Sequence, residues 1–169
     1  FYLMSREEIE WITRNLFVGN KLWTGGAKAT GGKTFDLRDI KAPIVLFASM
    51  GDNITPPQQA FNWVADVYSS TDEIKANGQT IVGLIHEDVG HLGIFVSGKV
   101  AKKEHAQIFE VLKYIQTLPP GLYGMEIHEI QHADGEVTYD VTLHERSLEA
   151  LKKLQKYDRV DEKPFQAVA

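Results

Sequence analysis

Two side chains that could act as the acid and the base of a catalytic triad follow two apolar runs of the chain. Asp52 comes just after the run 44–49, and His91, preceded by Gly90, comes just after the run 80–86. In a nucleophile–histidine–acid triad the carboxylate orients the imidazole, and the imidazole takes the proton of the nucleophile. Because loops at the carboxyl ends of parallel strands gather at one edge of a sheet, we expect Asp52 and His91 to meet there.

The nucleophile of such a triad is not evident in the sequence. There is no cysteine, and no serine lies in a Gly-x-Ser-x-Gly setting, which would present it on a sharp turn between a strand and a helix. We therefore expect the nucleophile to come from an upstream segment of the same protein or from a partner chain. The first residue is Phe1, which fits a chain that continues upstream, and we expect these 169 residues alone to be inactive.

Each candidate also has a simpler interpretation. The sequence Gly51-Asp52-Asn53 ahead of two prolines is favourable for a turn, and a lone histidine often bonds to a backbone carbonyl or caps a helix. The two residues together, in this order and each after a strand, favour the catalytic interpretation. Asp88 lies close to His91 in the sequence, so it competes with Asp52 as the orienting acid.

The elements that must position these residues alternate between strands and helices. The apolar runs 44–49 and 80–86 predict buried strands, and apolar stripes predict helices over about 58–68 and 100–117. Residues 69–79 are predicted to be loop and turn. This order implies two parallel neighbours in an α/β sheet covered by helices. Since two strands do not form a stable open sheet, the pattern also favours further strands upstream.

The segment before the first strand is predicted to contain one helix and one exposed excursion. Ser5 and Glu8 form a capping box, so an amphipathic helix is expected over about 6–18. Residues 19–38 are rich in Gly, Lys and Thr and are expected at the surface. They do not form a phosphate-binding P-loop, because position 27 is alanine where the motif needs glycine.

After residue 121 the period of the apolar residues changes from helical to alternating. Alternation on both sides of Asp134-Gly135 predicts a β-hairpin, followed by a helix over about 145–156 and a polar tail. We therefore predict two parts, a core over 1–121 with a lid-side segment at about 5–38, and an appended hairpin, helix and tail over 122–169.

The composition excludes several classes of function. Eighteen basic and 23 acidic residues give a net charge of −5, which argues against a nucleic-acid binder. No apolar run approaches the roughly 20 residues that cross a bilayer, and the first residues of this sequence are not expected to be a signal peptide, because they lack a basic region and a long apolar stretch. The lack of cysteine fits a reducing compartment, so we expect the cytoplasm. His128 and His132 would lie about 13 Å apart along a strand, so no metal site is predicted. The oligomeric state, including a homodimer, is left open.

Several segments resemble polyhydroxyalkanoate synthases. Residues 8–25 resemble the stretch before the acid-bearing strand of that family, and 36–45 followed by 51–57 resemble its strand and acid loop. Gly90-His91 fits its Gly-His. The resemblance covers about residues 5–117 and is strongest to an uncharacterised branch, large bacterial proteins described as synthase-like or as a domain of unknown function.

The resemblance implies the C-terminal half of an α/β-hydrolase fold with a cysteine or serine nucleophile upstream. Members of the family polymerise 3-hydroxyacyl groups from coenzyme A thioesters, so acyl-coenzyme A would be a substrate and no cofactor is expected. Asp52 would orient His91 as general base. Independently of the resemblance, Trp23 in the exposed excursion and Asn53 are candidates to line a substrate entrance, with packing as the alternative role of Trp23.

The hairpin and helix after residue 122 depart from true synthases. This departure keeps open a second interpretation, in which the chain is a non-catalytic scaffold or binding module with the hydrolase fold. The additional residues would then bind a partner.

Overall fold

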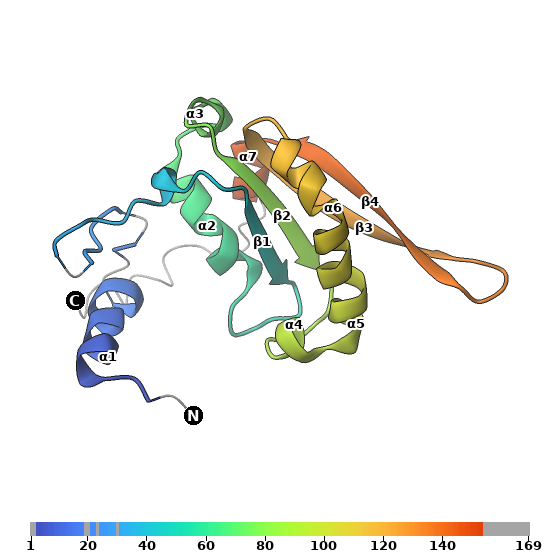
Figure 1. Ribbon diagram of the computed structural model, residues 1–169, viewed down its shortest axis with the longest axis horizontal. Coiled ribbons are helices and arrows are strands. Elements are labelled where there is room, and N and C mark those ends of the chain that lie inside the picture. The colour runs from blue at the N-terminus through green and yellow to red at the C-terminus, as the bar shows by residue number, and fades with distance from the viewer. Residues whose placement is uncertain (1–2, 19–20, 23, 30, 154–169) are drawn as a thin grey trace.

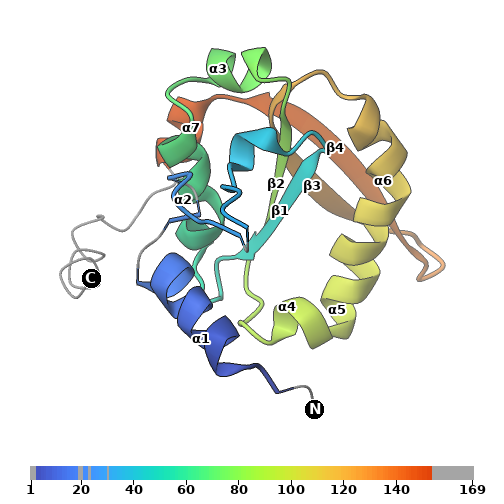
Figure 2. The same cartoon turned by 60° about the vertical axis from the view of Figure 1, so that its left-hand side comes forward.

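The computed structural model describes residues 3–18, 21–22, 24–29 and 31–153, and these residues build one four-stranded sheet with helices on both faces (Figures 1 and 2). The strands, in the order β1-β2-β3-β4, are β1 (Ile44–Ser49), β2 (Thr80–His86), β3 (Gly121–Gln131) and β4 (Val137–Arg146). The α-helices are α1 (Arg6–Ile12), α2 (Pro57–Val67), α3 (Thr71–Ala76), α4 (Gly93–Val96), α5 (Gly98–Val100), α6 (Ala106–Thr117) and α7 (Leu148–Lys153). Single turns of other helix types are Thr13–Phe17, Leu37–Asp39 and Ala101–His105.

The predicted parallel pair of strands is confirmed. β1 and β2 pair in parallel from Ile44 opposite Ile81 to Ser49 opposite His86. Because the two strands end at the same level, the turns that carry the candidate acid and base leave the sheet side by side. The strand order therefore provides the common edge that the triad interpretation requires.

The sheet is completed by the hairpin. β3 pairs in parallel with β2 from Thr80 opposite Gly121, and β4 runs antiparallel to β3 along its length. Beyond Gly124 the hairpin extends past the rest of the sheet as a two-stranded arm (Figure 1). Residues after 120 thus supply two of the additional strands that β1 and β2 need, and further strands from upstream stay a prediction.

The two connections between parallel strands have opposite hand. Both step in the same direction across the sheet, from β1 to β2 and from β2 to β3, but α2 covers one face and α6 the other (Figure 2). One of them therefore departs from the right-handed rule for such crossovers. This topology explains why the order of elements alone did not place β3 beside β2.

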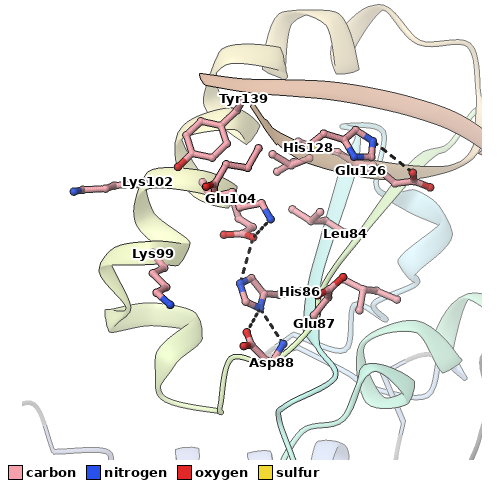
Figure 3. A pocket seen from close by; sticks show the side chains of 15 residues that line it. Leu84, His86, Glu87, Asp88, Lys99, Lys102, Glu104, Glu126, His128 and Tyr139 are labelled. Atoms are coloured by element: carbon pink, nitrogen blue, oxygen red, sulfur yellow. Dashed lines mark hydrogen bonds and ion pairs between the residues drawn. The ribbon is translucent and has the colours of Figure 1, made fainter. Parts of the chain in front are cut away.

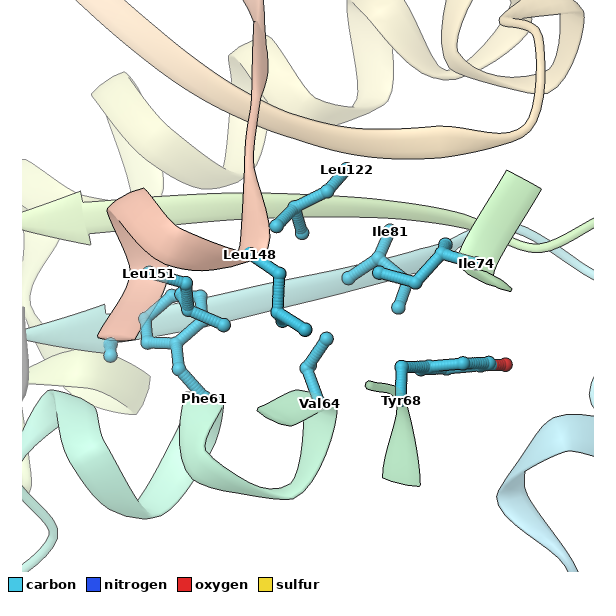
Figure 4. Packing of buried hydrophobic residues seen from close by; sticks show 9 residues of the cluster. Phe61, Val64, Tyr68, Ile74, Ile81, Leu122, Leu148 and Leu151 are labelled. Atoms are coloured by element: carbon cyan, nitrogen blue, oxygen red, sulfur yellow. The ribbon is translucent and has the colours of Figure 1, made fainter. Parts of the chain in front are cut away.

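Two apolar layers hold the sheet between its helices. On one face α2 and α7 pack over the strands (Figure 4), with a core of Ala48, Phe61, Val64, Tyr68, Ile74, Ile81, Leu122, Leu148 and Leu151. On the other face the buried core is Val82, Leu84, Ile115 and Met125. Neighbouring residues Ile81 and Val82 point to opposite faces, as a strand buried on both sides requires.

Helix boundaries differ from the prediction at three places. Residues 71–76 form α3 rather than loop, because Ser70 caps the helix by accepting a hydrogen bond from the Glu73 amide and Ile74 is fully buried. The first helix keeps its predicted capping box but leaves α-helical geometry after Ile12. The last helix begins at Leu148, and its predicted residues beyond 153 lie outside the described residues.

A buried polar cluster joins the segment before β1 to the sheet. The Tyr68 hydroxyl donates to Gln79 Oε1 at 2.6 Å, and Gln79 Nε2 donates to the carbonyls of Leu37 and Ile40. These bonds fix the entry into β1 relative to β2. Within the described residues, no helix combines the length and the apolarity that crossing a bilayer requires.

Candidate functional site

The turns after β1 and β2 bring the predicted acid and base into contact. Asp52 Oδ2 lies 2.9 Å from His91 Nδ1, although the two residues are 39 positions apart in the sequence. The Asp52 side chain is fully buried, while 32% of the His91 side chain is exposed. The arrangement is thus a buried carboxylate beneath an imidazole that reaches the surface.

The carboxylate of Asp52 is held in its ionised form. Oδ1 accepts hydrogen bonds from the amides of Ile54 and Thr55, both at 2.9 Å, and Oδ2 accepts from the Thr55 hydroxyl at 2.6 Å. Burial raises the pKa of Asp52, but the hydrogen bonds from Thr55, His91 and Ile54 outweigh it and hold the pKa well below its usual range. A carboxylate whose oxygens are both occupied is a fixed negative charge, and it cannot rotate away from the imidazole.

The position of Asp52 decides which tautomer His91 adopts. An ionised carboxylate only accepts hydrogen bonds, so His91 Nδ1 carries the proton and donates to Asp52. Nδ1 also lies 3.0 Å from the Thr55 hydroxyl. Nε2 makes no hydrogen bond within the described part of the chain, so its lone pair is available at the surface to take a proton. This is the orientation that a general base needs.

Thr55 is the site residue that the sequence analysis missed. Its amide and hydroxyl both donate to Asp52, and the hydroxyl also touches the imidazole of His91. The signal was present in the sequence, because an aspartate whose side chain bonds the backbone two and three residues ahead is a common turn. The turn interpretation of Asp52 and the catalytic one are therefore compatible, since the same bonds shape the turn and hold the acid.

Two contacts lock the turns together. The Ser49 hydroxyl donates to the carbonyl of Val89 at 2.6 Å and accepts from the Gly51 amide at 3.2 Å. A side chain at Gly51 would overlap the backbone carbonyl of Asp88, so only glycine permits this approach. Ser49 is fully buried and engaged in these bonds, which marks it as structural rather than as a nucleophile.

Asp88, the alternative acid, lies away from His91. Its carboxylate is 89% exposed and lies 3.4 Å from Nδ1 of a different histidine, His86. The geometry therefore pairs His91 with Asp52. The catalytic role of that pair stays a prediction.

Of the two residues predicted at a substrate entrance, the structure describes only Asn53. Asn53 is exposed and lines a cavity of about 450 Å³ beside Asp52, together with Met50 and Ile54. Trp23 lies outside the described residues. In the described part of the chain, no three histidine or acidic side chains gather closely enough to hold a metal ion.

Comparison with known proteins gives one family model and two curated relatives. A family model described as "Protein of unknown function (DUF3141)" matches residues 1–169. The chain is 43% identical over 173 residues to a Rhizobium meliloti protein called "Uncharacterized protein in ackA 5'region", an alignment that covers 98% of this chain and 23% of that protein. It is 30% identical over 100 residues to "Poly(3-hydroxyalkanoate) polymerase subunit PhaC" of Thiocystis violacea, covering 57% of this chain and 24% of that subunit.

The chain therefore spans about a quarter of the length of the curated relatives that it matches. The match to the polymerase subunit agrees, over part of the chain, with the synthase resemblance of the sequence. No solved protein structure matches the chain.

Proposed function

The chain belongs to the DUF3141 family of proteins of unknown function, and we propose that it is the acid-and-base part of an α/β-hydrolase-type enzyme. The enzyme would act on acyl esters or thioesters by transfer or hydrolysis. In this proposal Asp52 orients His91, and His91 is the general base. A cysteine or serine nucleophile comes from a segment outside these residues.

One observation carries the proposal. A buried, fully hydrogen-bonded carboxylate lies 2.9 Å from His91 Nδ1, while Nε2 of this partly exposed side chain has no hydrogen-bond partner among the described residues. Acyl transfer requires the two nitrogens of the imidazole to have different partners. One nitrogen takes a proton, while the acid stabilises the resulting cation through the other.

The roles of the two residues follow from the hydrogen bonds. His91 Nε2 takes the proton from the nucleophile as that group attacks the acyl carbon, and Asp52 stabilises the resulting imidazolium. The proton then passes to the leaving thiol or alcohol. In the second half, Nε2 takes a proton from water or from an incoming hydroxyl, which attacks the acyl-enzyme; as the bond to the nucleophile breaks, Nε2 returns the proton to the nucleophile.

The surface around the pair favours an apolar substrate group or an apolar protein segment. Met50 and Ile54 on one turn, and Leu92, Phe95 and Val96 just after His91, are all half exposed or more. Large apolar side chains that remain exposed around a polar site often mark a binding surface. The printed name of the PhaC relative suggests 3-hydroxyacyl thioesters as the first substrates to test.

The proposal is tested in the natural protein by release of thiol from 3-hydroxybutyryl-coenzyme A and from butyryl-coenzyme A. His91→Ala should lower kcat about 10⁴-fold. His144→Ala, which changes an exposed histidine of the hairpin, should leave kcat unchanged and serves as the matched control. Unchanged turnover in His91→Ala would refute the role of His91 as the base, and a natural protein that binds these thioesters without turning them over would support the scaffold interpretation instead.

A further inference from the structure

The structure contains a second acid–histidine pair, His86 and Glu104. His86 is at the end of β2, five residues before His91. His86 and Glu104 form part of the wall of a groove of about 700 Å³ between the helical segment 98–105 and the hairpin (Figure 3). We propose that His86 is a positioning residue that sets the shape of the turn 87–91 and thereby the approach of His91 to Asp52. The expected effect of His86 on turnover rests on the proposed function, whereas its effect on the shape of the turn does not.

The ring of His86 organises the turn through its backbone. His86 Nδ1 lies 3.2 Å from the amide nitrogens of both Asp88 and Val89, and both amides donate to it. A nitrogen that accepts two amide hydrogen bonds carries no proton, so the exposed Asp88 carboxylate at 3.4 Å does not form an ion pair with it in this state. The two amide hydrogen bonds therefore place a lone pair on Nδ1 and the ring proton on Nε2.

Glu104 fixes the other side of the ring. Its Oε1 lies 3.5 Å from His86 Nε2 and 3.9 Å from Lys103 Nζ, and its side chain is only 3% exposed. Figure 3 shows His86 between Glu104 and Asp88, with the helix on one side and the end of β2 on the other. The carboxylate oxygen lies within ion-pair range of Nε2, a placement that favours a proton on Nε2 and so leaves Nδ1 as the acceptor for the two amides.

The far side of the turn is held by β1. Val89, whose amide donates to His86, accepts a hydrogen bond from the Ser49 hydroxyl through its carbonyl at 2.6 Å. The backbone of Asp88 lies against Gly51, one residue before Asp52. The turn is thus clamped between His86 and the turn that carries the acid, and movement on either side would displace His91.

The same geometry excludes a second catalytic base at this position. The Nδ1 lone pair of His86 is occupied by amides, its Nε2 carries the proton, and 13% of the side chain is exposed. His86 therefore acts through backbone groups rather than on a substrate.

The test compares two substitutions of similar size, one with and one without a hydrogen-bond acceptor near the position of Nδ1. His86→Asn keeps an oxygen close to the position of Nδ1, and His86→Leu keeps similar bulk without an acceptor. In the natural protein, labelled with ¹⁵N-histidine, we expect the imidazole nitrogen shifts of His91 in His86→Asn to match the wild type. In His86→Leu they should show loss of the hydrogen bond to Asp52. Thermal unfolding of each variant confirms that it is folded.

Kinetics give the second readout. His86→Leu should lower kcat about 100-fold with little change in KM, since a base displaced by about 1 Å costs that much, and His86→Asn should recover most of the loss. Unchanged His91 shifts in folded His86→Leu, or His86→Asn as impaired as His86→Leu, would overturn the inference. Failure of the proposed function would look different, because His91→Ala would then retain turnover while the nitrogen shifts still depended on His86.

Discussion

The pairs Asp52–His91 and His86–Glu104 use the same two kinds of side chain at one end of the sheet, yet their hydrogen bonds are opposite. In the first pair the acid is saturated by four donors, and Nε2 of the histidine makes no hydrogen bond to any residue that the structure describes. In the second pair the histidine Nδ1 is saturated by two backbone amides, and Glu104 Oε2 has no partner in the described part of the chain.

The difference shows what makes an acid–histidine pair available for chemistry. Proximity alone does not, because both histidines lie within 3.5 Å of a carboxylate oxygen. The unpaired nitrogen decides the role. His91 is 32% exposed and its Nε2 has no partner in the described ranges, whereas His86 is 13% exposed and its Nδ1 accepts two amides of the turn. One pair can therefore move a proton to or from a ligand, and the other holds the first in place.

The largest expected effect separates the two acids that the sequence left as alternatives. Asp52→Asn should lower kcat about 10⁴-fold, because an amide in place of the acid favours the wrong tautomer of His91. Asp88→Asn should change kcat less than twofold, since its carboxylate is 89% exposed and does not contact His91. Steady-state kinetics of thioester cleavage measure both. If Asp88→Asn were the more damaging change, the assignment of the orienting acid would be wrong.

The next effect tests the clamp between the turns. Gly51→Ala should separate the turn of Asp52 from the backbone of Asp88, lowering kcat about 100-fold and the free energy of unfolding by about 1–3 kcal/mol. Gly90→Ala is the matched control, because a side chain there meets open space. Urea unfolding and kinetics on both variants check this. Equal effects of the two substitutions would mean that the close approach does not position His91.

Thr55 allows a smaller and sharper comparison. Thr55→Val keeps the shape but removes the hydroxyl that donates to Asp52 Oδ2 at 2.6 Å, whereas Thr55→Ser keeps the donor. We expect kcat to fall about tenfold in Thr55→Val, the equivalent of one hydrogen bond to a charged group, and to stay near the wild-type value in Thr55→Ser. Should both variants lose activity equally, the methyl group rather than the hydroxyl would support the site.

The sequence predicted the parts of this site that depend on local pattern. The apolar runs located β1 and β2 within a residue or so, and the position of Asp52 and His91 just after them placed both at one edge. The clamp through Gly51 was missed because it depends on a contact between two turns that no local pattern encodes, whereas the bonds of Thr55 to Asp52 lie within one turn and had a local signal in the sequence. His86 was predicted only as the last residue of a strand. The structure shows that its ring accepts hydrogen bonds from the backbone amides two and three residues further along the chain.

The sheet was predicted less completely for a similar reason. Alternating apolar residues identified both strands of the hairpin, but they do not indicate which strand the hairpin pairs with. The connections β1–β2 and β2–β3 have opposite hand, whereas connections between parallel strands are usually right-handed. The α3 helix was not predicted, because Ser70 and Glu73, which form its N-terminal cap, are polar residues typical of loops. In each case the missing information was the partner of a segment rather than its local preference.

The smallest expected effect concerns stability in acid. Because the folded protein lowers the pKa of Asp52, its ionised form contributes stability that is fully present above the unfolded pKa of about 3.9 and is lost as the pH falls through the folded value. The difference in the free energy of unfolding between wild type and Asp52→Asn should therefore shrink below about pH 4. Urea unfolding at a series of pH values measures this difference.

Asp36 provides the control for this measurement. The hydrogen bonds from Arg38 also lower the pKa of Asp36, but this pair lies at the surface, where salt screens it. Added salt should reduce the contribution of Asp36 and leave that of Asp52 nearly unchanged, because most donors to Asp52 are uncharged and the carboxylate is buried. Equal salt sensitivity at the two positions would mean that Asp52 is held by charge at an open surface, and the contrast between a buried, fixed acid and an accessible base would fail.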